Sequence, residues 1–393
     1  MKLVSESLAA ASLIAVCLIT VSTARADDKD DHLNLYIVSN LTSDLPGVAL
    51  NTDPVLQNAW GVAFTPGASP FWISDNATGC STLYDGQGAP QTPPTPLLVK
   101  IPLPGGSVPA TACKHADPKN PPNPTPAAPT GLVWNPTSTF LVPNQNPSKT
   151  ATFIFDTEDG TISAWTGGLM PPDQAVLAVD NSKSGAVYKG LVFGTNTKGV
   201  FLFATNFNAG TVDVFGPANA NSNGKYVPVT TDGNFNDPYI PPGFAPFGIQ
   251  NINGDLFVTY AKQNKEKHDD VAGPGNGFVD VFDTDGHLLR RFASRGPLNS
   301  PWGVARASYA FGRFSGDVLI GNFGNGQVNA FDSDGDFLGT LSDVKGKPLS
   351  IDGLWTLTLG GGRNSSSDTL YFTAGPNGET NGLFGTITPT SKK

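Results

Sequence analysis

Short apolar stretches, each bounded by glycine or by a polar turn, recur along the whole chain. The pattern of a glycine followed by an aliphatic residue occurs six times, at Gly61, Gly131, Gly190, Gly248, Gly303 and Gly353. A second glycine follows each first one and opens a strand that usually ends in an aromatic residue, as in GTVDVF from Gly210. An apolar strand separates the paired glycines, and a turn and a fourth strand follow the aromatic residue. Each copy therefore predicts a four-stranded antiparallel meander.

Six such meanders predict an all-β fold, a six-bladed β-propeller over residues 34–389. The sixth copy ends at its third strand, residues 384–388, and the strand at residues 34–38 belongs to no copy. We therefore expect the N-terminal strand to pair with the last blade, which closes the ring and removes exposed sheet edges. Two alternatives remain open: a seven-bladed ring that uses the strand at residues 140–142, and an open sandwich.

The composition agrees with many short strands joined by turns. The chain has 393 residues, of which 45 are Gly and 34 are Pro, and both residue types oppose helix interiors. Charged residues make up only 15%, while 24 Phe, 8 Tyr and 6 Trp can bury a large core. A long all-helical protein and wholesale disorder are therefore both excluded.

The first 26 residues have the pattern of a secretory signal. Lys2 precedes an apolar run at residues 8–21, which is short for a bilayer span, and Ala24-Arg25-Ala26 forms an A-x-A cleavage site. An acidic tail at residues 27–33 and a basic tail at residues 390–393 flank the propeller. We expect an exported protein, periplasmic or extracellular, without a membrane span in the mature chain.

Charge and cysteine content narrow the class of partner and the compartment. Cleavage removes Lys2, Arg25 and Glu6, which leaves 22 basic and 32 acidic residues, or a balance of −10. Without a basic run, nucleic acid is excluded as the expected partner. Two cysteines remain, and in an exported protein they predict a Cys80–Cys113 disulfide. It would tie down a Pro-rich insertion at residues 103–129.

Several longer strings resemble an uncharacterised family of exported bacterial propeller-like proteins. They are NLTSDLPGVALNTDPVLQNAWGVAF from Asn40, FWISDNATGCSTLYDG from Phe71 and LYFTAGPNGETNGLFGTI from Leu370. Some members of that family carry a C-terminal sorting tail, which this chain lacks. The resemblance implies the fold and export, but no reaction. More distantly, the blades are similar to NHL-type and gluconolactonase-type six-bladed propellers; the metal-binding Glu of the latter is missing from the segment Gln57-Asn58-Ala59-Trp60.

The predicted topology brings the starts of the inner strands and the loops between second and third strands to one face of the disc, because alternate strands point the same way. The residues expected to bind a ligand at this channel face are Trp60, Asp75, Asn76, Phe247, Trp302 and Trp355. The tryptophans would stack on a sugar or another flat ligand. In the alternative interpretation they wedge between neighbouring blades.

Asp and Asn side chains from several of these loops suggest a hard cation on the axis. Calcium prefers six to eight oxygen ligands, and the candidates are Asp75, Asn206, Asn322 and Asp352. The alternative is that each residue hydrogen-bonds its own turn.

No H-E-x-x-H, G-x-S-x-G or Walker A string occurs, and the four histidines are scattered. The sequence therefore favours a non-catalytic propeller that binds a glycan, peptide or surface protein through its channel face. The alternative is a calcium-assisted hydrolase or lactonase at the central channel, with Asp75 or Asp352 as base.

Overall fold

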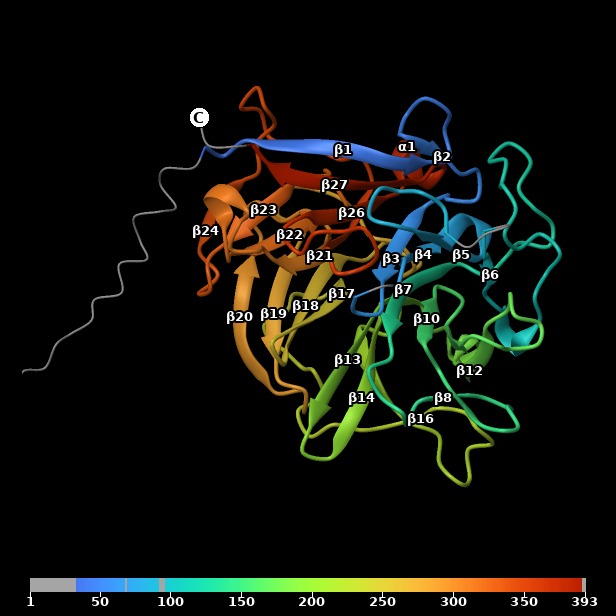
Figure 1. Cartoon of the computed structure of the whole chain (residues 1–393). Coiled ribbons are helices and arrows are strands. Elements are labelled where there is room, and N and C mark those ends of the chain that lie inside the picture. Colours follow the sequence, from blue (N-terminus) through green and yellow to red (C-terminus); the bar gives the residue numbers. More distant parts are fainter. Residues whose placement is uncertain (1–32, 68, 92–95, 391–393) are drawn as a thin grey trace, which may run out of the picture.

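The computed structural model describes residues 33–67, 69–91 and 96–390 as a six-bladed β-propeller (Figure 1). The expected signal at residues 1–26 and most of both tails lie outside the described residues. Each of the six large sheets is antiparallel through the strands of one blade, and the blades follow one another in chain order. Within the described residues, no helix has the length and apolar character needed to cross a membrane.

The first three blades each have four strands. Blade 1 contains β3 (Ala59–Ala63), β4 (Phe71–Asp75), β5 (Cys80–Tyr84) and β6 (Val99–Lys100). Blade 2 contains β7 (Pro129–Trp134), β10 (Phe153–Thr157), β11 (Thr161–Trp165) and β12 (Val176–Asp180). Blade 3 contains β13 (Tyr188–Asn196), β14 (Gly199–Asn206), β15 (Thr211–Gly216) and β16 (Val227–Pro228).

The next two blades repeat the arrangement, and the sixth shares its sheet with the start of the chain. Blade 4 contains β17 (Phe244–Ile252), β18 (Asp255–Lys262), β19 (Phe278–Phe282) and β20 (Leu288–Ser294). Blade 5 contains β21 (Pro301–Arg306), β22 (Val318–Asn322), β23 (Val328–Phe331) and β24 (Phe337–Thr340). Blade 6 contains β25 (Leu354–Leu359), β26 (Leu370–Ala374), a short helical turn α1 (Pro376–Glu379) and β27 (Leu383–Pro389).

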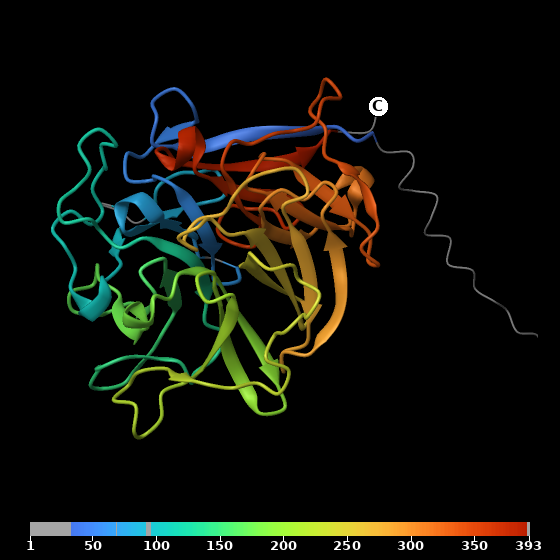
Figure 2. The same cartoon turned by 180° about the vertical axis from the view of Figure 1, so that it is seen from behind.

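The ring closes as the sequence predicts. The N-terminal strand β1 (Tyr36–Ser43) pairs antiparallel with β27, and Ile37 lies opposite Thr388. Figure 1 shows the blue β1 lying along the red β27, and Figure 2 shows the same pairing from behind. A short β2 (Asn51–Thr52) extends this sheet to five strands. The last blade thus joins both ends of the folded chain.

The alternative of a seventh blade is wrong, because the strand around residue 141 has only one partner. β8 (Leu141–Val142) pairs with β9 (Lys149–Thr150) in a separate two-stranded sheet, formed by the connection between β7 and β10 of blade 2. Phe140, fully buried beside it, packs edge-on against Phe193 and Tyr226 of blade 3. This hairpin covers the join between two blades and adds no sector to the ring.

The hydrophobic core lies mainly between blades. Phe71 and Tyr84 of blade 1, for example, pack with Tyr371 and Phe384 of blade 6. Near the axis the backbones themselves touch, which requires glycine. A Cβ atom on Gly303 would lie 2.4 Å from the carbonyl oxygen of Trp355 in the next blade. The recurrent first glycine therefore marks close approach between inner strands.

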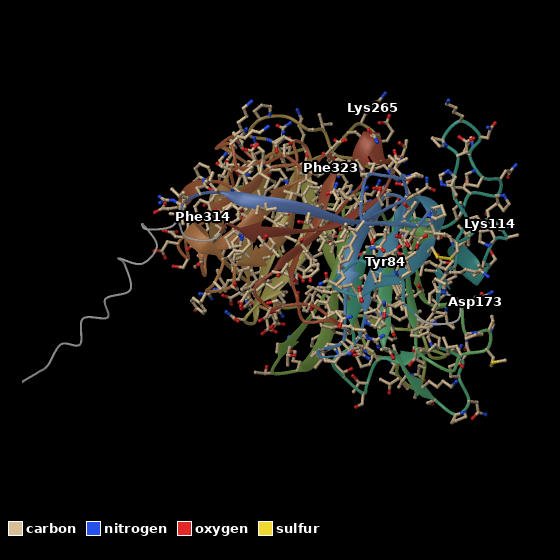
Figure 3. The ribbon with its side chains drawn as sticks, turned by 45° about the horizontal axis from the view of Figure 1, so that its top comes forward. Tyr84, Lys114, Asp173, Lys265, Phe314 and Phe323 are labelled. Carbon is tan, nitrogen blue, oxygen red and sulfur yellow. A yellow bond between two sulfur atoms is a disulfide. The ribbon has the colours of Figure 1, made fainter. Side chains whose placement is uncertain are left out.

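Cys80 and Cys113 form a disulfide, as the sequence predicts. The bond joins β5 to the Pro-rich insertion, and Figure 3 shows it in yellow close to Lys114. The Cys113 backbone N–H also donates to the Thr78 carbonyl oxygen at 2.8 Å. The insertion is therefore fixed to the face on which the inner strands begin.

Candidate functional site

An aromatic cluster fills the axis at the level where the inner strands begin. We call it the aromatic plug; its buried members are Trp60, Phe207, Phe247, Trp302 and Trp355. The Trp60 and Trp355 rings stack with their centroids 3.4 Å apart, and Trp302 meets both rings edge-on at 5.9 Å. These rings pack on one another rather than between blades. The four predicted aromatic residues therefore lie together near the channel mouth.

Burial limits what the plug offers to a ligand. Trp60, Phe247 and Trp355 are each only 1% exposed, and Trp302 is 9% exposed. Phe323, half-buried, stacks on Trp355 with a centroid distance of 4.0 Å, and Figure 3 labels it. The plug forms a floor, and Phe323 contributes the accessible aromatic surface beside it.

A buried ion pair lies directly on this floor. The Lys189 ammonium of β13 is paired with the Glu158 carboxylate, which follows β10. The Lys189 side chain is 3% exposed and its Nζ lies 5.2 Å from the centre of the Trp60 ring. Trp302 Nε1 donates to the Lys189 carbonyl oxygen at 2.9 Å, which fixes the start of β13 against the plug. Burying two charges is costly unless each is well partnered, so this pair at the channel mouth is a candidate functional group.

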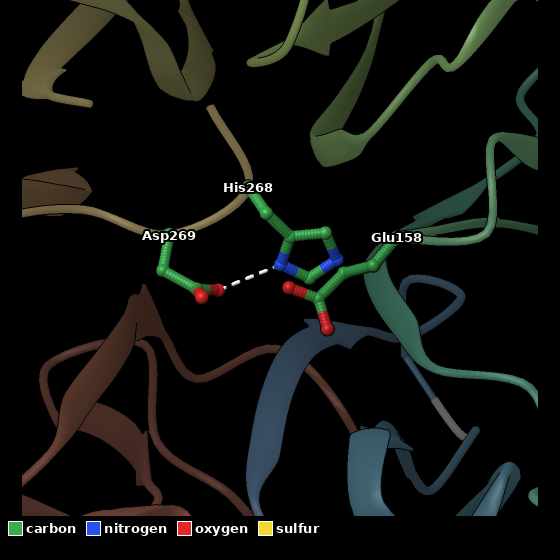
Figure 4. Close-up of side chains that lie close together, drawn as sticks. All are labelled: Glu158, His268 and Asp269. Carbon is green, nitrogen blue, oxygen red and sulfur yellow. Dashed lines mark hydrogen bonds and ion pairs between the residues drawn. The ribbon is translucent and has the colours of Figure 1, made fainter. Parts of the chain in front are cut away.

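The insertion between β18 and β19 brings a histidine and a carboxylate to the same pair. Asp269 Oδ1 lies 3.8 Å from Lys189 Nζ and 2.7 Å from His268 Nδ1. This hydrogen bond raises the pKa of His268 and lowers that of Asp269. Figure 4 shows His268, Asp269 and Glu158 pointing toward one another, although Glu158 comes from blade 2 and the others from blade 4. His268 and Asp269 are about half exposed, so a ligand can reach them.

Amide side chains extend the network into blades 1 and 6. Asn76 Nδ2 donates to Glu158 Oε2 at 2.9 Å, and Asn58 Nδ2 donates to Asn76 Oδ1 at 3.2 Å. Asn58 Nδ2 also donates to Glu379 Oε2 at 2.8 Å, and its Oδ1 accepts from Trp355 Nε1 at 3.1 Å. Burial raises the pKa of Glu379 to about 7, and the nearby Glu158 charge acts in the same direction.

These contacts form one connected set that we call the mouth network, consisting of Asn58, Asn76, Glu158, Lys189, His268, Asp269 and Glu379. Its members come from blades 1, 2, 3, 4 and 6. Each lies at the start of an inner strand or in a loop between second and third strands. The topology therefore gathers polar groups that are up to 321 residues apart in the sequence.

Of the residues that the sequence singled out, Asn76 is in the mouth network and Asp75 is not. Asp75 is fully buried inside blade 1, where its Oδ1 accepts from Thr82 Oγ1 at 3.2 Å. Burial raises the pKa of Asp75 well above its usual range. A carboxyl group that is enclosed in this way cannot contact a ligand at the mouth, and burial disfavours its charged form.

The other predicted calcium ligands are also engaged locally. Asn206 Oδ1 accepts from the backbone of Val187 and Ala209, and Asn322 Oδ1 accepts from the backbone N–H of Asn299. Asp352 is exposed, and its Oδ2 accepts from the Asn377 backbone N–H at 2.8 Å. Together with the buried Asp75, this arrangement does not fit a shared calcium site; the side chains hold neighbouring loops and strand starts in place.

In the described part of the chain, one group of three or more His, Cys, Asp or Glu side chains brings its ligand atoms within 4.8 Å of one another: Glu158, His268 and Asp269. The Lys189 ammonium already pairs with Glu158 and lies close to Asp269, so it supplies the positive charge that a cation would bring. The group is better suited to hydrogen bonding and to proton transfer through His268 than to holding a metal.

Five members of the mouth network were not identified from the sequence: Asn58, Glu158, Lys189, His268 and Asp269. The signal for Glu158 was its place between Asp156 and Asp159 in a loop assigned to the channel face. Lys189 directly precedes Gly190 of the repeated pattern, where the other copies have mainly aromatic or small residues. A charged residue at that recurrent position is the signal that could have found it.

Two sequence relatives come from a giant virus. Uncharacterised protein R648 of Acanthamoeba polyphaga mimivirus is 30% identical over 354 residues, covering 90% of this chain and 79% of the viral protein. Uncharacterised protein L690 of the same virus is 31% identical over 355 residues, covering 90% and 84%. The chain belongs to their family. No family model matches the chain. The bacterial source expected from the resemblance is not supported by these relatives.

Solved propellers of similar shape are remote in sequence. A streptogramin B lyase has a TM-score of 0.48 at 13% identity, and the match covers 90% of this chain and 98% of the lyase chain. A gluconolactonase from Xanthomonas campestris has a TM-score of 0.46 at 14% identity, covering 85% and 87%. At this level of likeness, the neighbours carry no argument about the activity of this chain.

Proposed function

We propose that this protein is an exported, non-catalytic propeller that binds a polar ligand, a glycan, peptide or surface protein, at the mouth network. The observation that carries the proposal is the connected set of polar side chains from five blades around the buried Lys189–Glu158 pair. A fold needs no such set for closure, because the blades already pack through their apolar cores.

The composition of the mouth network favours a ligand rich in hydrogen-bond donors. Glu158, Asp269 and Glu379 offer carboxyl oxygens, and Lys189 is the network's one ammonium group. Sugar hydroxyl groups donate to such acceptors, and the half-buried Phe323 provides an apolar face beside them. A glycan is therefore the ligand class that fits best, ahead of a peptide or surface protein.

Binding to immobilised glycans tests the proposal. We expect the wild type to retain at least one glycan, and Glu158→Gln and Asn76→Ala to reduce its apparent affinity at least tenfold. Lys198→Ala serves as the matched control, because Lys198 is exposed and pairs with Asp232 away from the mouth. Equal retention by wild type and both mouth variants, with unchanged circular dichroism, would contradict the proposal. So would failure of the wild type to bind any glycan, peptide or surface extract in the same format.

The second candidate is a hydrolase or lactonase at this end of the channel, without the calcium site expected from the sequence, which the predicted ligands do not form. The hydrogen-bonded His268–Asp269 pair beside Glu158 favours it, since a partnered histidine is a suitable general base. A panel of esters and lactones, assayed with and without Ca²⁺ or EDTA, tests this function directly. Turnover that His268→Gln abolishes would support it, and the Asp75→Ala and Asp352→Ala variants report on the carboxylates expected from the sequence.

Export is part of the proposal. It is supported by the apolar run and A-x-A site in residues 1–26 and by the disulfide, which persists in oxidising compartments. Expression of the full chain in a bacterial host, followed by fractionation and N-terminal sequencing, tests it. Mature protein beginning at Asp27 outside the cytoplasm is the expected result; uncleaved cytoplasmic protein would contradict it.

A further inference from the structure

The central channel contains a cavity below the aromatic plug, at the end opposite the mouth network. Its volume is about 510 Å³, within the usual range for sites that bind small molecules. The lining comes from the later parts of all six inner strands, such as Gly61–Ala63 of β3 and Thr356–Thr358 of β25. The mouth network lies at the beginnings of those strands, so the two features occupy opposite ends of the channel.

The chemistry of the cavity differs from that of the mouth. None of the described residues that line it carries an ionisable side chain. Its lining residues are mostly aliphatic or aromatic, with Leu132, Val192 and Leu357 among them, and Trp302 belongs to both the plug and the lining. A charged ligand would lose its hydration here without gaining a counter-ion, so the cavity selects against charge.

Polar groups near the open end are few, and their positions are fixed. Asn251 Nδ2 donates to the Phe193 carbonyl oxygen at 2.9 Å, and Gln250 Oε1 accepts from the Asn251 backbone N–H at 3.1 Å. Gln250 and Thr358 are half-buried, which places them where the lining meets solvent. Each inner strand is the edge strand of its sheet, so its second backbone edge also faces the channel. A polar group on a ligand would meet hydrogen-bonding partners there.

We propose that this cavity is a second binding site, for a small neutral molecule with an apolar ring or chain and at most one or two hydrogen-bonding groups. The site is separate from the mouth network and does not depend on the function proposed for it. The plug closes the inner end, so the ligand enters from the face opposite His268 and Glu158. Binding places the ligand against Trp302, whose fluorescence then reports occupancy.

Titration with the neutral fluorophore N-phenyl-1-naphthylamine tests the site. We expect saturable binding of one probe per chain, with enhanced probe emission and quenched tryptophan emission. Gln250→Trp and Thr358→Trp, which narrow the open end from two different blades, should each weaken binding at least tenfold. Thr52→Trp on the exposed strand β2 adds the same side chain elsewhere and should leave binding unchanged.

The outcomes distinguish probe binding in the cavity from probe binding at the mouth and from misfolding of a variant. Glu158→Gln should bind the probe as the wild type does, and a loss in that variant would assign the probe to the mouth and overturn the proposal. Absence of saturable binding to wild type, or unchanged binding in both narrowed variants, would also overturn it. Circular dichroism melts identify a variant that fails to fold; because the two substitutions lie in separate blades, the other one still decides the result.

Discussion

The two ends of the central channel are formed by the same six strands, yet they differ completely in charge. At the mouth, Lys189, Glu158 and Asp269 lie within a few ångströms of one another, whereas the lining of the far cavity holds no ionisable side chain among the described residues. The difference in charge follows from which parts of the chain supply side chains to each end. Loops and an insertion deliver side chains to the mouth, while the far end is lined mainly by strand residues whose pattern serves packing. One ring of strands can therefore carry two unrelated sites.

Removing the disulfide tests whether the mouth needs its attached insertion. Cys80 and Cys113 are 33 residues apart, and the Cys80→Ala/Cys113→Ala variant should lose roughly 3–4 kcal/mol of unfolding free energy through the freed loop. Denaturant unfolding measures this loss. Because the insertion is fixed beside the mouth, glycan binding should weaken while binding of the naphthylamine probe stays the same under native conditions. An equal loss of glycan affinity and of probe affinity would show that the two ends are not independent.

Breaking the buried ion pair removes charge from the mouth alone. Lys189→Met leaves Glu158 with its Asn76 donor but without its ammonium partner, and we expect a loss of about 3 kcal/mol. The double variant Lys189→Met/Glu158→Gln should recover part of that loss, because no unpaired charge remains. As a control, Lys198→Met at an exposed pair should melt like the wild type. A double variant less stable than Lys189→Met would refute the assignment of the cost to the stranded carboxylate.

The narrowest part of the ring, where the inner strands touch, should affect both ends together. Gly248→Ala would place a Cβ atom 2.3 Å from the Trp302 carbonyl oxygen, so the strands must separate, at a cost of about 2 kcal/mol. Gly167→Ala is the matched control, since nothing lies within 4 Å of its added methyl group. Thermal melts compare the two variants. We expect Gly248→Ala to weaken both ligands, and an effect confined to one end would contradict a shared support.

The sequence was sufficient for the ring because the ring is periodic. Six pairs of glycines at similar spacing predicted the blades. A strand without a blade at the start of the chain and a missing strand in the last blade predicted the pairing of β1 with β27. The recurrent first glycine even marked the close approach of backbones, as at Gly303. Each of these features repeats, so one weak local signal is strengthened by its copies.

The mouth network could not be predicted in the same way, because its contacts do not repeat. Lys189 and Glu158 are 31 residues apart in different blades, and no repeated pattern of opposite charges marks the two positions as a pair. His268 and Asp269 depend on the path of a long insertion, which no periodicity fixes. Conversely, Asp75 looked like a ligand because it ends a strand at the channel face, but its side chain turns into the blade toward Thr82. Topology predicts which face a residue is on, but not where its side chain points.

The last expected effect concerns pH, and it separates the two ends by titration. Burial raises the pKa of Glu379 from 4.5 to about 7 in the folded protein, so between these values the unfolded chain is more ionised than the folded one. Stability should therefore fall as pH rises through this window and level off above about 7, by up to about 3 kcal/mol from this group. Glu379→Gln cannot ionise, so its melting curves should lack that part of the fall. The described residues that line the cavity include no group that titrates, so probe binding should be constant from about pH 5 to 8 in both proteins. If the stabilities of wild type and variant change in parallel with pH, Glu379 is not the group responsible. If the probe affinity changes over the pH range in which Glu379 titrates, the two ends of the channel form a single site.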